Sequence, residues 1–222
     1  MALTRLRSLA CFLSALLAIP LPSAAFDTPL SDTAIREAYF LGQRHDETMA
    51  RLLDKYTTRL PQPKTGPYIE AVTFFTPFAQ LVLNSDQHST GYSAQQAEID
   101  HRDQAESVRV VIDIFFTDSY GPFIPRPTGS KSGSPTGLVP RPLDFWKDFQ
   151  VQFFDNDKPL RPFTSSGQPK LSCSVDGGCM VAGATLQFKF LAESFPTNYT
   201  TVQIDPPEGE QVVVDVDLSS LR

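Results

Sequence analysis

The residues best suited to acid–base or metal chemistry are the three histidines, His45, His88 and His101. His45 and His101 lie on the packing sides of predicted helices, where a lone histidine more often makes a structural hydrogen bond than binds a metal. His88 lies in a polar stretch and is expected to contact water. His45, Asp46 and Glu47 are adjacent in a predicted helix, so their side chains point in different directions and cannot share one metal ion.

Sequence motifs of established catalytic sites do not occur in the chain. The spaced histidines of zinc hydrolases, the Gly-x-Ser-x-Gly turn of serine hydrolases and a glycine-rich phosphate loop are all missing. The sequence therefore predicts no catalytic residue, no cofactor and no metal ligand.

Acidic residues gather in a predicted turn at the end of a strand. Asp155, Asn156 and Asp157 could offer oxygen ligands to calcium, with Asp205 or Glu208 completing the site. The same residue types build tight turns, because asparagine and aspartate tolerate a left-handed backbone. A lysine follows directly at position 158 and favours the turn over the calcium site.

A group of aromatic residues raises the alternative of carbohydrate binding. Exposed rings could form a platform for sugars, whereas the same rings buried together would fill the core. The group comprises Tyr120, Phe145, Trp146 and Phe149. The core interpretation is favoured, and glycan binding is kept as the second hypothesis.

Two cysteines, Cys173 and Cys179, enclose a short segment with Asp176, Gly177 and Gly178 at its centre. These central residues are typical of a hairpin turn. An even number of cysteines in an exported chain favours a disulfide, which for so short a loop contributes about 2–3 kcal/mol. A redox pair and a zinc site fit less well, because neither Cys-x-x-Cys spacing nor further ligands are present.

The first 25 residues have the three parts of a secretory signal peptide. Arg5 and Arg7 form a positive start, residues 9–19 are apolar, and small residues end at Ala25. Cleavage after Ala25 would make Phe26 the first residue of a secreted or periplasmic protein without a transmembrane segment. An uncleaved N-terminal anchor is the alternative interpretation.

Length and composition describe an ordinary folded protein. The 222 residues are 41% hydrophobic and include 17 phenylalanines, enough to build a core. The formal net charge of -6 argues against a nucleic-acid partner, because phosphate backbones require basic surfaces.

Apolar and polar residues alternate with a period of two through most of the chain, which predicts antiparallel sheets covered on one face. With the apolar runs at 68–75 and 78–83 added, about seven to nine strands are expected, a number typical of an immunoglobulin-like β-sandwich. Pro77 is expected to separate those two runs. The alternating segments lie around residues 108–116, 149–153, 186–190, 202–204 and 214–218.

The apolar stripe over residues 31–59 predicts one helix packed on this sandwich, with Gly42 close to another backbone. A short polar helix is expected over 93–107. Residues 121–142 are rich in proline and glycine, and carry basic but no acidic residues, which predicts a long flexible loop. The expected organisation is a signal peptide (1–25), a helical segment (26–66) and a β-sandwich domain (67–222).

No motif identifies a ligand, so the expected function rests on the fold class alone. β-Sandwiches commonly act as binding or adaptor modules. We expect an exported, non-enzymatic module for binding or envelope assembly, with a protein or glycan partner. A secreted hydrolase is the third hypothesis, and the basic loop at 121–142 is a candidate docking arm for an acidic partner.

Overall fold

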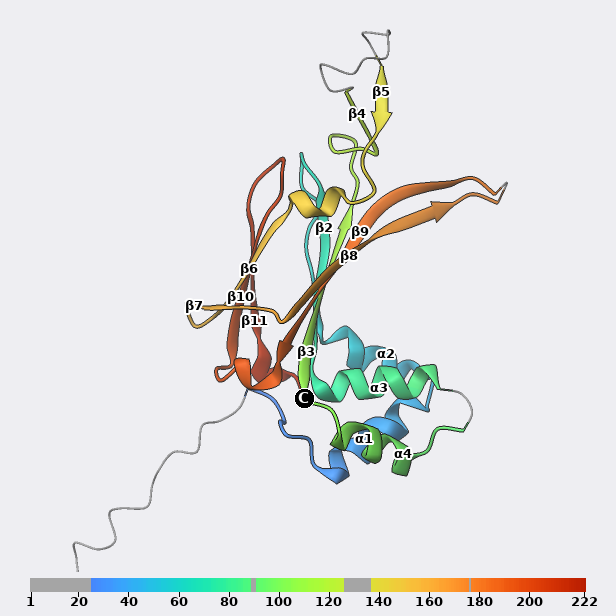
Figure 1. Ribbon diagram of the computed structural model, residues 1–222, viewed down its shortest axis with the longest axis vertical. Helices are drawn as coiled ribbons and strands as arrows, with labels where there is room; N and C mark the ends of the chain where they lie inside the picture. Colours follow the sequence, from blue (N-terminus) through green and yellow to red (C-terminus); the bar gives the residue numbers. More distant parts are fainter. Residues whose placement is uncertain (1–24, 89–90, 126–136, 176) are drawn as a thin grey trace, which may run out of the picture.

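A computed structural model describes residues 25–88, 91–125, 137–175 and 177–222. Within these ranges the chain is mainly β, with antiparallel sheets of five, four and two strands and four α-helices. The two larger sheets lie face to face and the helices gather at one end (Figure 1). The predicted mainly β, antiparallel architecture is confirmed, although the described residues form eleven strands rather than seven to nine.

The five-stranded sheet has the order β1-β2-β3-β9-β8. Its central strand, β3, buries every second residue, as its alternating sequence predicts. The strands are β1 (Thr57–Arg59), β2 (Tyr68–Phe75), β3 (Ser107–Phe115), β9 (Cys179–Leu191) and β8 (Thr164–Cys173).

The four-stranded sheet has the order β11-β10-β6-β7. Asn156 and Asp157 join β6 to β7 with φ angles of 45° and 69°, so the acidic segment forms the tight turn that its residue types favour. The strands are β11 (Val212–Asp217), β10 (Tyr199–Asp205), β6 (Gln150–Asp155) and β7 (Lys158–Leu160).

Phenylalanines join the two sheets in one hydrophobic core. Phe153 of β6 contacts Phe188 and Phe190 of β9 edge-on, with ring centroids 4.9 Å apart in each pair. Phe190 also contacts Phe195, which follows the short 3-10 helix η2 (Ala192–Ser194). Because these rings come from both sheets, the core holds the two layers together.

The prediction of a single helix over residues 31–59 is wrong in detail, because the range holds two helices and a short strand. The break falls at His45, whose φ of 52° lies outside the helical range, and at Asp46, whose carboxylate accepts a hydrogen bond from the Thr48 amide at 2.9 Å. Such a side-chain cap starts a new helix and offers the backbone an alternative to continuing the first. The range contains α1 (Asp32–Gly42), α2 (Glu47–Asp54) and β1.

Helix α1 packs on two other helices, α3 (Pro77–Gln87) and α4 (Ala94–Arg102), rather than on a sheet face. The predicted close approach at Gly42 is confirmed, because a Cβ added there would lie 2.3 Å from the carbonyl oxygen of Val82 in α3. Helix α4 is shorter than the 93–107 segment predicted for it.

The strand expected at 78–83 is also wrong, because these residues belong to α3. The Thr76 hydroxyl accepts a hydrogen bond from the Ala79 amide at 3.3 Å, and Pro77 occupies the first turn. A threonine cap followed by proline is a strong helix start, since proline lacks only an amide hydrogen that this turn does not use. The short apolar run alone could not distinguish a strand from a buried helix.

Within the loop predicted at 121–142, the described residues form a two-stranded ribbon. Strand β4 (Phe123–Pro125) pairs with β5 (Leu138–Pro140), and the ribbon projects from the end opposite the helices (Figure 1). Arg141 anchors its base by donating to the Gly121 carbonyl at 3.0 Å. Residues 126–136, which carry the remaining basic side chains of this segment, lie outside the described residues.

Candidate binding surface

The outer face of the five-stranded sheet forms the floor of a surface that we call the trough. Strand β3 turns four fully buried side chains toward the core, so the residues between them face outward. The floor consists of the outward-facing side chains of β3 and its neighbours, including Phe75, Arg109, Val111, Asp113, Gln187 and Lys189.

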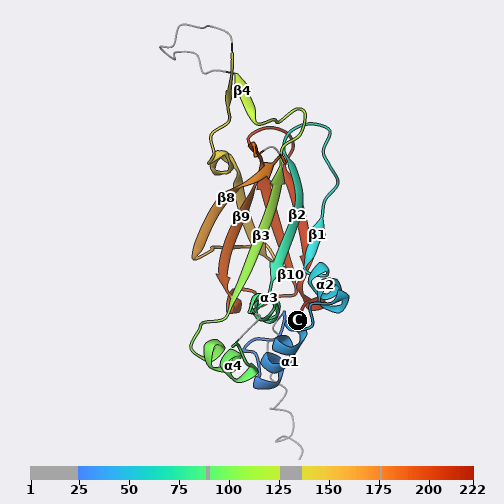
Figure 2. The same cartoon turned by 90° about the vertical axis from the view of Figure 1, so that its right-hand side faces the viewer.

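Two projecting parts of the molecule bound the trough. Helices α2 and α3 stand out from one end of the five-stranded sheet, and the β8–β9 hairpin curls out from the other end on the same side (Figure 1). Figure 2 shows the five-stranded sheet from the side on which these parts project. The predicted disulfide between Cys173 and Cys179 is confirmed and closes the far end of the hairpin. The disulfide therefore staples the hairpin at its tip.

Two positive charges face each other on the floor without a counter-charge. Arg109 of β3 lies directly opposite Lys189 of β9, an arrangement that destabilises a sheet when nothing neutralises it. Neither side chain forms an ion pair with any described residue. The Nε atom of Arg109 is buried and has no hydrogen-bond partner among the described residues. Burial lowers the pKa of Arg109 from its usual value. An acidic group supplied by a partner would neutralise the repulsion between the two cations and would give the Arg109 Nε a hydrogen-bond acceptor.

A third cation on the floor is already neutralised. Lys170 of β8 forms an ion pair with Asp113 at 2.7 Å, and Thr185 donates to the same carboxylate at 2.8 Å. The unneutralised positive charge is therefore confined to the part of the trough nearest the helices.

Cations also cover the aromatic rings of the floor. The Arg109 guanidinium lies 4.9 Å from the centre of the Phe75 ring, and the Lys170 ammonium lies 4.4 Å from the centre of Phe115. In each case a cation occupies one face of the ring, where a sugar could otherwise stack.

The aromatic group that raised the glycan hypothesis packs inside the protein. Tyr120, Phe145 and Phe149 are buried in one cluster, and burial raises the pKa of Tyr120 to about 12. Trp146 fills the space over Gly167 of β8, where an added Cβ would lie 2.1 Å from the indole nitrogen. The core interpretation of these residues fits this arrangement.

The acids considered as calcium ligands take part in local structure. Asp155 is buried and accepts hydrogen bonds from the amide and hydroxyl of Thr197, at 3.3 and 2.7 Å. Asp205 accepts from Gln211 at 2.7 Å. In the described ranges, no group of three or more histidine, cysteine, aspartate or glutamate side chains is arranged to hold a metal ion.

The histidines lie around the helices and do not form one site. His45 contacts Asp86 at 2.6 Å, outside the helical stripe where it was predicted. His88 is exposed to solvent, as predicted, and one face of its ring stacks on Tyr92 with ring centroids 4.6 Å apart. His101 contacts Glu106 at 2.8 Å beside a cavity of about 160 Å³.

Glu106 also accepts hydrogen bonds from the Thr28 hydroxyl at 2.5 Å and the Leu30 amide at 2.6 Å. This carboxylate therefore fastens the segment before α1 to the start of β3. The contact between His101 and Glu106 is therefore part of the hydrogen-bond network that holds this segment in place.

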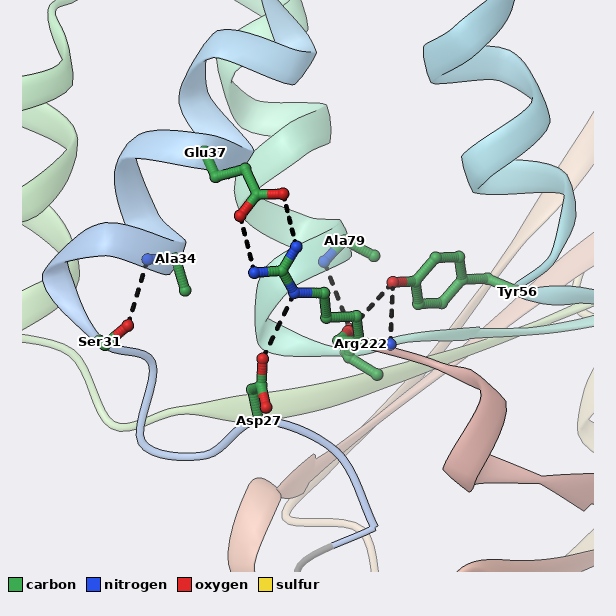
Figure 3. A network of polar contacts seen from close by, with 8 residues as sticks. Asp27, Ser31, Ala34, Glu37, Tyr56, Ala79 and Arg222 are labelled. Atoms are coloured by element: carbon green, nitrogen blue, oxygen red, sulfur yellow. Dashed lines mark hydrogen bonds and ion pairs between the residues drawn. The ribbon is translucent and has the colours of Figure 1, made fainter.

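Arg222 forms polar contacts with four residues from other parts of the chain near the helices (Figure 3). Its guanidinium donates two hydrogen bonds to Glu37 of α1, at 2.6 and 2.7 Å, and reaches Asp27 at 3.4 Å. Its backbone carbonyl accepts hydrogen bonds from Tyr56, at 3.0 Å, and from Thr76. This network ties the C-terminal segment after β11 to the helical layer.

Replacement of Glu37 by glutamine is expected to destabilise the protein by less than about 1 kcal/mol near neutral pH, because both partners are roughly half exposed to solvent. The hydrogen bond from Arg222 lowers the pKa of Glu37 below its usual value. The stabilisation is therefore present above the unfolded pKa of about 4.3 and is lost as pH falls through the lower folded value. Urea unfolding at neutral and acidic pH measures the difference in free energy of unfolding between Glu37→Gln and the wild type, with Glu193→Gln as the exposed control. A difference that grows in acid would contradict this prediction.

Comparisons with known proteins do not assign the chain to a family. No family model matches it, and searches of curated proteins and of solved structures find no significant similarity. Among the described residues, no helix has the length and apolar character needed to cross a membrane.

Proposed function

We propose that this protein is an exported, non-enzymatic binding module that engages its partner through the trough. The observation that carries the proposal is the pair Arg109 and Lys189, which face each other on an exposed sheet without a neutralising group. Two like charges held opposite each other are unfavourable in the isolated protein. A partner that supplies an acidic group would therefore gain binding energy from relieving this repulsion.

Export is the second part of the proposal. The signal-peptide pattern that ends at Ala25 supports it, as does the disulfide, since disulfides persist in oxidising compartments. Phe26, the proposed first residue of the mature chain, packs in the core against Phe195. On these grounds we propose a secreted or periplasmic location.

We also propose that the two large sheets have immunoglobulin-like topology. The order β2-β3-β9-β8 corresponds to strands A-B-E-D of that fold, and β11-β10-β6-β7 corresponds to G-F-C-C′. The fold supports binding only by analogy, because the same architecture serves many functions. The choice of the trough rests instead on its own charges. Glycan binding is less well supported, because cations cover the Phe75 and Phe115 rings.

Site-specific cross-linking in the exporting cell tests the proposal. A photoreactive amino acid at Gln187, on the trough floor beside Lys189, is expected to capture a discrete partner. The same group at Gln62, an exposed residue between β1 and β2, is the matched control. Adducts that form at Gln62 but not at Gln187 would place the binding surface elsewhere, and adducts at neither position would remove the support for a stable partner.

A further inference from the structure

We propose that the trough of one molecule receives the outer face of the four-stranded sheet of a second copy, so that copies stack head to tail. This inference rests on the proposed function, because it names the partner of the trough. It joins the two large sheet faces that point away from the core, one on each side of the molecule.

The outer face of the four-stranded sheet is acidic, whereas the trough has unneutralised positive charge at Arg109 and Lys189. Asp205, Asp215 and Asp217 point outward from β10 and β11, and no lysine or arginine lies among the outward-facing residues of this sheet. These three carboxylates form no ion pair with the described part of the chain. We call this surface the acidic face.

The charges of the two faces are therefore complementary across a contact between copies. Arg109 and Lys189 repel each other on the trough floor, and Asp215 and Asp217, two residues apart on the same side of β11, repel each other on the acidic face. Bringing the faces together relieves both repulsions, whereas contact between two identical faces would increase them. This difference selects a head-to-tail arrangement over a symmetric pair.

The dimensions of the two faces are compatible. Strand β3, which runs along the trough floor, has nine residues and therefore spans about 30 Å. Strand β10, the longest of the four-stranded sheet, has seven residues and spans about 23 Å. The acidic face is thus shorter than the floor on which it would lie.

Apolar side chains on the acidic face add a second reason for contact. Tyr199 and Val213 are 64% and 49% exposed on this face. The four strands of this sheet, of which β10 is the longest at about 23 Å, together cover only about 400 Å². This is roughly half the area that each partner buries in a standard stable interface. We therefore expect weak association that depends on protein concentration and salt, rather than a permanent dimer.

Contact between two different faces leaves one free trough and one free acidic face on every pair. Such a heterologous interface continues into longer assemblies unless a rotation closes it into a ring. A stack of copies would suit the role in envelope assembly that the sequence suggested.

Sedimentation velocity of the purified protein tests the proposal through two charge reversals, Lys189→Glu in the trough and Asp215→Lys on the acidic face. The wild type is expected to associate across the micromolar range at low salt, and much less at about 500 mM salt. Each variant alone is expected to associate at least about tenfold more weakly. An equal mixture of the two is expected to recover association, because the first retains a native acidic face and the second a native trough.

Matched controls separate this interface from a general effect of net charge. Lys64→Glu, between β1 and β2, and Glu193→Lys make the same charge changes at exposed positions outside the two faces, and should associate as the wild type does. Thermal unfolding of every variant verifies that the fold is retained. Equal association of the reversals and the wild type, or no recovery on mixing, would overturn the proposal.

Failure of the stacking proposal is distinguishable from failure of the proposed function. A wild type that stays monomeric while Gln187 captures a different protein would overturn stacking and leave the trough as a binding surface. A monomer without any capture at Gln187 would remove the support for both.

Discussion

Replacing Phe153 by alanine is expected to lower the free energy of unfolding by about 4 kcal/mol. Phe153 is 2% exposed and contacts Phe188 and Phe190 across the interface between the two sheets. Its removal leaves a cavity at the place where the layers are joined, and neither sheet can move to fill it without losing its other contacts. Urea-induced unfolding followed by circular dichroism would measure the loss.

The matched control is Phe163→Ala, because the Phe163 side chain is 58% exposed and lies outside the core. Its free energy of unfolding should stay within about 0.5 kcal/mol of the wild type. Similar losses for the two variants would contradict a core in which Phe153 joins the sheets.

Gly183→Ala is expected to destabilise the protein by about 3 kcal/mol, the upper end of the usual range for overpacking. A Cβ at this position would lie 2.0 Å from the carbonyl oxygen of Ile114 in β3. Because the collision is with backbone, rotation of a side chain cannot relieve it, and β9 must move away from β3. Thermal unfolding and amide hydrogen exchange of β3 and β9 would report the loss of pairing.

Gly178→Ala controls for the loss of a glycine from the same hairpin. A Cβ there would lie 3.5 Å from the Ser174 hydroxyl, which is an ordinary contact. Its melting temperature should therefore remain close to that of the wild type. Full stability of Gly183→Ala would show that β9 can leave β3 without cost, and would contradict the described register.

The trough and the core depend on the same two strands. Arg109 and Lys189 face outward from β3 and β9, while their neighbours in sequence are buried or, for Phe188, partly buried on the inner face. Strand alternation thus holds the two cations at fixed positions, because moving either would expose core residues. The repulsion between them is sustained by the packing on the opposite side of the sheet.

The helical layer shows where sequence patterns were insufficient. An apolar run of six residues at 78–83 suits a strand as well as a buried helix. Pro77, which together with the Thr76 cap starts α3, was interpreted as a separator of two strands. The stripe over 31–59 was continuous enough to predict one helix, yet the cap at Asp46 divides it. In both cases a local capping interaction outweighed the periodic pattern.

The sequence by itself determined the antiparallel β character, the disulfide between Cys173 and Cys179, the close backbone approach at Gly42 and the turn at Asn156 and Asp157. Each of these depends on residues near one another in the chain or on the chemistry of one residue type. Arg109 and Lys189 were visible as polar positions on two alternating strands, but 80 residues separate them in the chain. Only the tertiary structure decided that these strands pair and in which register, because strand pairing depends on the packing of the whole core. That pairing places the two cations opposite each other and thereby creates the trough's unneutralised charge.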